Sequence, residues 1–452
     1  MSALRASAPA TRGRPAATDA PRRGRPPARN EILRAGRLGG LEPENLARRF
    51  GTPLYAYDLG VVDRQVAALR AVLPPGFELA YAVKANPALA VVRHLARRGL
   101  GADVASGGEI EAALRAGVSP ATIVMTGPGK RDDELVLAVR TGLRAITVES
   151  LGELERLERV AAREGRVVPI LLRAAVSPEV ALERVRLVGD DGAGKFGMAD
   201  DDLRLAARRA ARSAHLEPLG IHAFGASNVV DAEALARHVE RTVERARAVA
   251  AEAGFTLRLV DAGGGLGIPY EPEDRELDLA ALGRRLRSIR NRLEGDATTR
   301  DARVLLEPGR FLVGPAGAYL ARVVDRKSVD GAHVVILDGG IHHLLRPALV
   351  GQEHRIRTFG SNGGPRPKAF PVTVAGPLCS GLDVLTSQAV MPPPAIGDLV
   401  AALDVGAYGF TESMPFFLSH PTPAEVVISD GEARLARRRI EPREWLAMQE
   451  VP

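Results

Sequence analysis

The stretch Tyr81–Pro87, YAVKANP, contains a lysine in a chain that nearly always uses arginine instead. Among 61 lysines and arginines, only five are lysines: Lys84, Lys130, Lys195, Lys327 and Lys368. Arginine stays protonated in proteins, whereas lysine can lose its proton and become a nucleophile. Most lysines are merely exposed charges, but Lys84 ends a short apolar run and is a candidate for covalent chemistry.

Other unusual polar residues also follow short, β-branched apolar runs. They are Ser106 and Glu109, the segment His222 to Ser227, the segment Gly263 to Gly267, and Glu307 with Arg310. Barrel enzymes build their active sites at the carboxyl ends of their parallel strands. We therefore expect these residues to lie near Lys84 on one rim.

From about residue 78, short apolar runs such as GADVAS and TIVMTG alternate with amphipathic helical patterns such as SLGELERLERVAAREG. This alternation predicts parallel βαβ units. Eight runs of this kind fit a (β/α)8 barrel, which normally takes about 250 residues. An open, doubly wound sheet is the structural alternative.

After Glu307–Gly309 the chain reads as strands without long helices between them, for example AHVVILDGG and AEVVISDGEARLARR. This pattern predicts a second, mostly antiparallel β domain. The segment before the barrel either adds a strand to it or joins the β domain. The predicted regions are a disordered Arg/Pro/Ala-rich tail (1–35), an N-terminal segment (36–60), the barrel (61–309) and the β domain (310–452).

Charge and cysteine content exclude several classes of protein. The formal net charge of +6 is accounted for by residues 1–30, which hold seven Arg and one Asp, so we expect no nucleic-acid partner. No apolar run approaches the ~18 residues that span a bilayer, so we expect no membrane association. The single cysteine, Cys379, fits a reducing compartment, and we expect a cytoplasmic protein.

The glycine run in DAGGGLGIPY (Asp261–Tyr270) would let the backbone approach a phosphate closely. Gly-rich turns are common after strands, and the acid and arginine of EPGR (Glu307–Arg310) could be a salt-bridged strand end. Beside a reactive lysine, however, they suggest pyridoxal 5′-phosphate, which needs a Schiff-base lysine, a phosphate pocket and an acid at its ring nitrogen. The nine histidines show no metal-ligand spacing, so we predict no metal site.

Eight motifs in order resemble the fold-type III pyridoxal-phosphate decarboxylases, which include diaminopimelate, ornithine and arginine decarboxylases. The similarity runs from about Thr52 to Ile428. The motifs are YAVKANP, DVASGGEIEAAL, KFG, DAGGGLGIPY, EPGRFLVGPAG, GPLCSGLDVL, GAYG and PAEVVI. The fold of this family, an N-terminal barrel and a C-terminal β domain, agrees with the pattern of elements above.

The resemblance implies a role for each matching residue. Lys84 would form the Schiff base, and Glu307 would pair with the pyridine nitrogen. Cys379, supplied by the partner subunit, would donate a proton, which makes a two-fold homodimer the active unit. The phosphate would be surrounded by Ser227, Gly263, Gly264, Gly265, Arg310 and Tyr408. The substrate would lie near Arg310, Arg346, Ser380 and Tyr408.

The departures from the family bear on the substrate. After the cysteine, diaminopimelate decarboxylases usually have Glu and ornithine decarboxylases Asp, each meeting a distal ammonium, whereas this chain has Ser380. Burying an unpaired ammonium would cost several kcal/mol, so Ser380 argues against both substrates. Val350 stands where diaminopimelate enzymes usually have Tyr, and Phe224 where the family usually stacks His on the cofactor ring. The segment FFLSHPTPAEV replaces a usual Tyr-Asn and Arg-Pro-Arg-Pro run, which reshapes the distal pocket.

We therefore predict a homodimeric carboxy-lyase for an L- or meso-α-amino acid, or for a modified, citrate-linked or carrier-linked one, in a specialised biosynthetic pathway. Diaminopimelate decarboxylation in lysine synthesis is the alternative. A racemase of related fold is disfavoured because such enzymes lack the GPLCSGLD element. A non-catalytic cofactor-binding or regulatory homologue is disfavoured by the presence of both Lys84 and Cys379.

Overall fold

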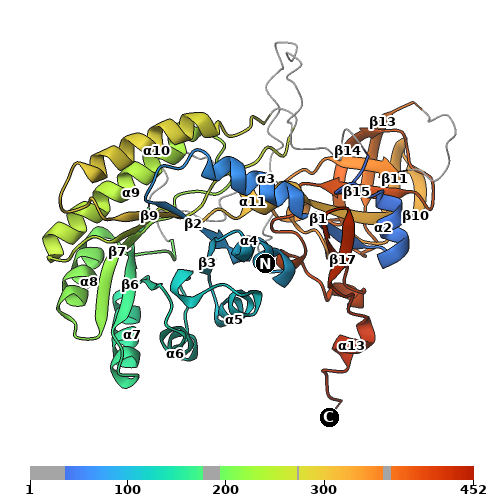
Figure 1. Ribbon diagram of the computed structural model, residues 1–452. Coiled ribbons are helices and arrows are strands. Elements are labelled where there is room, and N and C mark those ends of the chain that lie inside the picture. The colour runs from blue at the N-terminus through green and yellow to red at the C-terminus, as the bar shows by residue number, and fades with distance from the viewer. Residues whose placement is uncertain (1–35, 177–193, 272–273, 360–367, 452) are drawn as a thin grey trace, which may run out of the picture.

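The computed structural model describes residues 36–176, 194–271, 274–359 and 368–451. A barrel wrapped by helices lies beside a domain rich in β-sheet (Figure 1). The tail at 1–35, predicted to be disordered, lies outside the described residues. None of the helices in the described ranges is long and apolar enough to cross a membrane.

Eight parallel strands close into a barrel, and the last strand pairs with the first, with Phe77 opposite Val304 and Leu79 opposite Leu306. The strands are β2 (Phe77–Ala82), β3 (Gly101–Val104), β4 (Ile123–Met125), β5 (Ala145–Val148), β6 (Val168–Arg173), β7 (Leu216–His222), β8 (Leu259–Asp261) and β9 (Arg303–Leu306). The closed ring confirms the predicted (β/α)8 barrel and excludes the doubly wound sheet.

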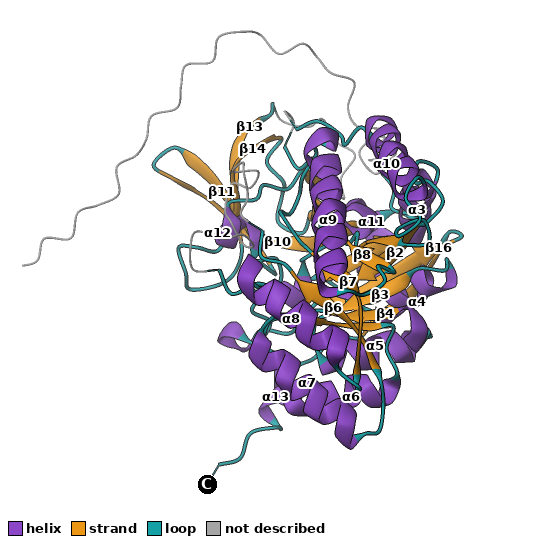
Figure 2. Ribbon diagram, turned by 90° about the vertical axis from the view of Figure 1, so that its left-hand side faces the viewer, coloured by secondary structure: helices purple, strands orange, loops and turns teal. Residues whose placement is uncertain are grey.

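Helices cover the outside of the barrel (Figure 2). They are α4 (Leu89–Arg97), α5 (Gly107–Ala116), α6 (Asp132–Thr141), α7 (Leu151–Arg163), α8 (Asp200–Arg212), α9 (Ala232–Ala253) and α10 (Leu279–Glu294). Several begin at a side chain that accepts a hydrogen bond from a backbone N–H of the first turn, as Ser106 does in α5 and Ser150 in α7. Ser106 and Glu109, expected on the rim, are thus part of a helix cap: the Glu109 carboxylate accepts from the backbone N–H of Ala105.

The second domain is built on a nine-stranded sheet in which most neighbours are antiparallel, as predicted. Its central path runs β14-β13-β11-β10-β1-β16-β17, and β15 pairs with both β10 and β12. The strands are β1 (Leu54–Asp58), β10 (Gly317–Val329), β11 (Ala332–Leu337), β12 (Ile356–Phe359), β13 (Phe370–Ala375), β14 (Val384–Met391), β15 (Leu399–Leu403), β16 (Ala424–Ser429) and β17 (Glu432–Arg437). Short helices flank it: α2 (Pro43–Phe50), α11 (Arg310–Val313), α12 (Arg346–Val350) and α13 (Pro442–Leu446).

Strand β1 ties the start of the described chain to this sheet. Leu54 lies opposite Leu320 on one side and Ala424 on the other, so β1 joins the sheet and not the barrel. The chain then enters the barrel through α3 (Leu59–Arg70), where the Gln65 side chain donates to the carbonyl oxygen of Phe311 at 2.7 Å. The two ends of the barrel sequence are therefore held beside each other.

Candidate active site

The inner face of the barrel changes from apolar to polar toward the carboxyl ends of its strands. A small cluster of buried side chains from six strands contains Ala80, Val124, Ala145, Leu171, Leu259 and Leu305. Successive residues of a strand point to opposite faces, so the residue two places further along shares the inner face. For all but the first of these positions that residue is polar: Thr126, Thr147, Arg173, Asp261 and Glu307.

A cavity opens above this polar layer. It brings together residues that follow different strands, as the expected rim arrangement requires. Its lining consists of Ala82, Lys84, Phe224, Ser227, Asn228, Gly264, Gly265, Leu266, Glu307, Gly309, Arg310 and Tyr408. Of the nine cofactor residues expected from sequence, Gly263 alone is outside this lining, and it lies in the same loop.

Lys84 lies in the short turn η1 (Val83–Ala85) directly after β2. Its Nζ donates to Asp103 Oδ2 at 2.5 Å, and Asp103 Oδ1 accepts from Thr126 Oγ1 at 2.7 Å. Burial would lower the pKa of Lys84, but the charges of Asp103 and Glu307 outweigh it and the pKa lies above its ordinary value. Lys84 is therefore an ammonium ion here and must lose a proton before it can act as a nucleophile.

Glu307 lines the cavity and lies beside two buried titratable side chains that are not on the lining. Its Oε2 is 3.6 Å from His222 Nε2, and ligand-type atoms of His222, Asp261 and Glu307 all lie within 4.8 Å of one another. Burial would raise the pKa of Glu307, but His222 and Lys84 lower it overall. Burial and the neighbouring Glu307 raise the pKa of Asp261 well above its ordinary value. The surroundings thus favour the charged form of Glu307 and the neutral form of Asp261.

The same three side chains have distances that would suit a metal ion, which the sequence did not indicate because they come from three strands. Within the described residues, Glu307 Oε1 is buried without a hydrogen-bond partner. Because Glu307 lines the cavity, this oxygen can accept a hydrogen bond from a ligand N–H.

The glycine run after β8 lets two loops approach each other closely. Gly263 and Gly265 have φ of 64° and 93°, which L side chains rarely adopt. A Cβ on Gly264 would lie 2.3 Å from the carbonyl oxygen of Glu307. The Asp261 carboxylate accepts from the Gly263 N–H at 2.9 Å and fixes the start of the run.

Arg310 extends along the cavity wall from α11. Its Nη1 donates to the hydroxyl of Tyr270 at 2.8 Å, and its Nη2 lies 3.4 Å from Ser227 Oγ. Its guanidinium carbon is 4.7 Å from the centroid of the Tyr408 ring, and that of Arg346 is 4.6 Å from the same centroid. Tyr408 therefore connects Arg346, which is not on the cavity lining, to the site.

Cys379 and Ser380 lie on the loop between β13 and β14, and neither is on the cavity lining. The Cys379 side chain is exposed. Asp383 holds this loop, because its carboxylate accepts from the backbone N–H groups of Leu378 and Ile341, both at 2.7 Å. Within one chain, the two residues are not brought to Lys84.

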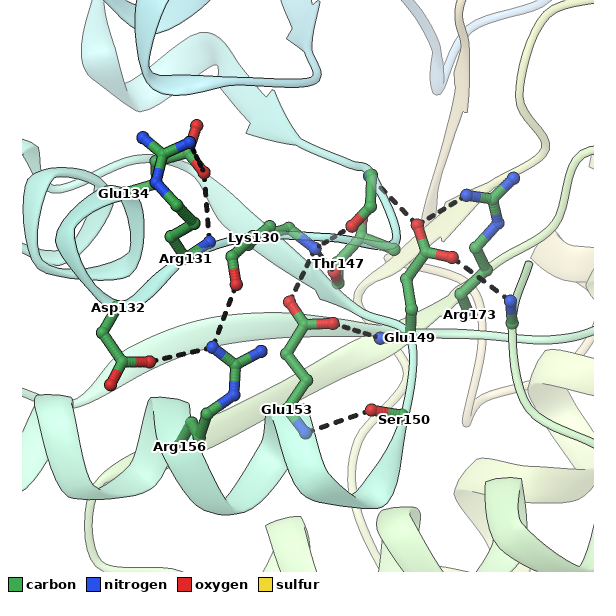
Figure 3. Close-up of polar contacts among 12 residues, drawn as sticks. Lys130, Arg131, Asp132, Glu134, Thr147, Glu149, Ser150, Glu153, Arg156 and Arg173 are labelled. Atoms are coloured by element: carbon green, nitrogen blue, oxygen red, sulfur yellow. Dashed lines mark hydrogen bonds and ion pairs between the residues drawn. The ribbon is translucent and has the colours of Figure 1, made fainter. Parts of the chain in front are cut away.

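A separate cluster of buried charges lies on the rim beside β4, β5 and β6 (Figure 3). Lys130 Nζ donates to Glu153 Oε1 at 2.7 Å and to two backbone carbonyl oxygens at 2.7 and 2.6 Å. Beside it, Arg173 donates to Glu149 at 2.6 Å. All three donors of the Lys130 ammonium are used, so this cluster fastens the loops after the strands.

Sequence reasoning missed the partners of the expected residues. Asp103 was not singled out, and His222 and Asp261 were noted only as parts of motifs. The period-two pattern of a barrel strand carried a signal, since Asp103 stands between two buried apolar residues, Ala102 and Val104. A lone acid at that position predicts a side chain inside the barrel.

Comparisons with known proteins agree with this architecture. The family model "Pyridoxal-dependent decarboxylase, pyridoxal binding domain" matches residues 59–314, which comprise the barrel and its immediate flanks. The crystal structure of diaminopimelate decarboxylase from Helicobacter pylori complexed with L-lysine superimposes with a TM-score of 0.81. The two are 28% identical, and the match covers 90% of this chain and 98% of that one.

Curated relatives are similar over nearly their whole length. The L-glutamyl-[BtrI acyl-carrier protein] decarboxylase of Niallia circulans is 31% identical over 404 residues, which are 87% of this chain and 92% of the relative. The diaminopimelate decarboxylase of Aquifex aeolicus is 32% identical over 406 residues, 89% and 92% of the two chains. The chain therefore belongs to the fold-type III pyridoxal-dependent decarboxylases and is an amino-acid carboxy-lyase.

Proposed function

We propose that this protein binds pyridoxal 5′-phosphate in the cavity after the barrel strands and uses it to release CO2 from an α-amino acid that lacks a free distal ammonium. The observation that carries this proposal is the placement of Lys84 and Glu307 on one cavity that also reaches Arg310 and the glycine run. The amine, the acid and the anion-binding groups, which this cofactor requires together, follow three different strands, β2, β8 and β9.

The residues of the cavity fit the cofactor. Ser227, Gly264, Gly265 and Arg310 offer a hydroxyl, close backbone approach and a guanidinium for the phosphate, and the space a Cβ would fill at Gly264 is taken by backbone. Glu307 Oε1, which has no hydrogen-bond partner among the described residues, can accept from a protonated ring nitrogen, and Lys84 would supply the amine for the aldehyde.

Asp103 controls the protonation of Lys84. Burial and Glu307 raise the pKa of the Asp103 carboxyl, and its Oδ2 is 2.5 Å from Lys84 Nζ. A proton can therefore pass from the ammonium to Asp103 when the neutral amine is needed. The Lys84–Asp103 pair is neutral overall before and after this transfer, so it costs little in a buried site.

The chemistry that bound pyridoxal phosphate would supply here is an electron sink for the pair left on the α-carbon when the C–CO2 bond breaks. The chain supports this by favouring a negative charge at Glu307, because His222 and Lys84 lower the pKa of its carboxyl. Phe224 lines the cavity as an apolar face where the family usually has a titratable histidine. The negative charge of Glu307 would therefore stabilise a positive charge at the ring nitrogen of the cofactor.

The α-carbon must then gain a proton, and we assign that donor to Cys379 of the partner subunit. Its thiol is exposed and lies outside the cavity of its own chain, so a second subunit would have to present it. This assignment requires a two-fold homodimer with shared active sites. A cytoplasmic location remains an expectation from the single cysteine.

The proposed substrate class rests on Ser380. Ser380 offers no charge to a distal ammonium, which favours an amino acid whose distal end is modified or attached to a carrier. A relative named for a carrier-protein-bound glutamyl substrate supports this reading. Diaminopimelate decarboxylation is the second candidate, favoured by the relatives of that name and by the presence of both Arg310 and Arg346.

Borohydride reduction followed by peptide mass spectrometry tests cofactor binding. A pyridoxyl group should be fixed on Lys84 and absent in Lys84→Ala, whereas Lys327→Ala, which changes an exposed lysine, should label like the parent. CO2 release from a panel of free and conjugated amino acids tests the reaction. A labelled protein that releases no CO2 from any of them would be a non-catalytic homologue, and rapid turnover of meso-diaminopimelate would reverse the order of the two candidates.

A further inference from the structure

Gln352, between α12 and β12, faces two buried arginines of the site. Its Oε1 is 3.5 Å from Nη1 of Arg310 and 3.4 Å from Nη1 of Arg346. Both distances are long for hydrogen bonds, as expected for one oxygen shared between two donors. Both guanidinium groups also lie against the ring of Tyr408. The amide oxygen therefore occupies the position where a ligand oxygen would bridge the arginine pair.

His354 fixes which way the Gln352 amide points. Its Nδ1 lies 3.0 Å from the carbonyl oxygen of Leu403, an acceptor only, so Nδ1 carries the proton. Burial, together with the nearby arginines, lowers the pKa of His354 to about 4, so the ring is neutral and its Nε2 is an acceptor. Gln352 Nε2 donates to that nitrogen at 3.1 Å, which turns Oε1 toward the arginines.

Two of the three cations around Gln352 have a carboxylate partner. Arg346 forms an ion pair with Glu412, with Nε 2.9 Å from Oε2 and Nη2 3.1 Å from Oε1. Arg355, which also faces His354, pairs with Asp404 at 2.5 Å. Arg310 lines the cavity, where the cofactor phosphate would take its charge. A second carboxylate on the substrate would then bring an unbalanced charge into a buried site, which is costly.

We propose that Gln352 is a specificity-determining residue: it holds the Arg310–Arg346 pair with a neutral oxygen, so that the site selects an uncharged distal acyl group, an amide or thioester, over a free carboxylate. This inference rests on the proposed function and deepens it. Ser380 has no negative charge to pair with a distal ammonium. Gln352 and Glu412 occupy the arginine groups that would otherwise bind a distal carboxylate. A conjugated acyl group has neither charge.

The kinetic test compares L-glutamate with its γ-N-methylamide, which differ only at the distal end. The parent holoenzyme should have the higher kcat/KM for the amide. Gln352→Ala should reduce the ratio of kcat/KM for the amide to kcat/KM for L-glutamate by about tenfold. The main cause should be a lower KM for L-glutamate, because the substitution leaves the two guanidinium groups without the Gln352 oxygen and able to bind a carboxylate. Glu412→Gln should shift the ratio in the same direction by freeing the charge of Arg346. Glu353→Ala, at the exposed neighbouring position, should leave the ratio unchanged.

A binding measurement separates this inference from the proposed reaction. Calorimetry on the holoenzyme compares glutarate with its monoamide, glutaramate, neither of which can be decarboxylated as an amino acid. A preference for the monoamide that falls in Gln352→Ala supports the inference even if no substrate releases CO2, an outcome that would overturn the proposed function alone. The opposite outcome is also possible: the enzyme releases CO2 from the amide, but Gln352→Ala has the same amide-to-acid ratio of kcat/KM and the same monoamide-to-glutarate ratio of affinity as the parent. That result would overturn the inference alone.

Discussion

Replacing Asp103 with asparagine should make Lys84 a better nucleophile at neutral pH. The side chain keeps its shape but loses the charge that holds the Lys84 ammonium at 2.5 Å. A hydrogen bond between charged groups contributes about 1.5–3 kcal/mol. Because the Lys84 side chain is 42% exposed, solvent screening favours the lower end of that range. About 1.4 kcal/mol corresponds to one pKa unit, so the pKa of Lys84 should fall by about one.

The sign of the effect follows from the direction of this shift. The pKa of Lys84 is raised in the folded protein, so the neutral amine is scarce at pH 7 and its fraction increases as the pH rises toward that pKa. In Asp103→Asn the same fraction of neutral amine should be reached about one pH unit lower. At a fixed pH the variant should therefore contain about tenfold more of the neutral amine. The rate of pyridoxal phosphate uptake by the apoprotein should increase by that factor.

Stopped-flow absorbance at pH values from 7 to 10 measures this uptake. Glu111→Gln, which changes an exposed acid on α5, is the matched control and should reproduce the parent profile. An Asp103→Asn profile that coincides with the parent, or that moves to higher pH, would refute the idea that Asp103 sets the protonation of Lys84.

Three further substitutions probe other parts of the barrel. Lys130→Met leaves the Glu153 carboxylate buried without its cation and should destabilise the protein by about 3–5 kcal/mol, read as a lower thermal midpoint; Lys130→Met with Glu153→Gln should recover most of the loss. Gly264→Ala places a Cβ 2.3 Å from the carbonyl oxygen of Glu307 and should weaken pyridoxal phosphate binding at least tenfold in equilibrium dialysis, with the fold retained by circular dichroism. Cys379→Ala should lower kcat for CO2 release about a hundredfold with little change in KM, while borohydride labelling persists.

Each of these expectations has a contradicting result. An unchanged midpoint in the Lys130 variant would mean that the buried pair contributes nothing to stability. Undiminished cofactor affinity in Gly264→Ala would place the phosphate away from the glycine run. Full activity in Cys379→Ala would require a different proton donor and would remove the main reason to expect shared active sites.

The sequence was sufficient to predict the barrel and the place of its chemistry. Apolar runs that alternate with amphipathic helices favour parallel strands, and parallel strands all end at the same rim. Lys84, Glu307 and Arg310 could therefore be expected together although more than 200 residues of sequence separate the first from the other two. The cavity that they line in the structure follows from that topology.

The sequence did not show which of the two domains contains the strand at residues 54–58. Residues 54–58 have a strand pattern, but nothing local says which sheet receives them. The structure inserts β1 between β10 and β16, because hydrogen-bonding partners far along the chain are available there on both sides.

Only the tertiary structure decided the pairings that control the site. The register between neighbouring strands sets Asp103 against Lys84, and His222 and Asp261 against Glu307, and no single strand sequence contains that register. The orientation of Gln352 depends in the same way on His354 and on a carbonyl oxygen of β15. Residue types determine which groups can ionise or donate a proton, whereas burial and neighbours brought from distant segments determine the direction in which each pKa shifts and the partner that each donor finds.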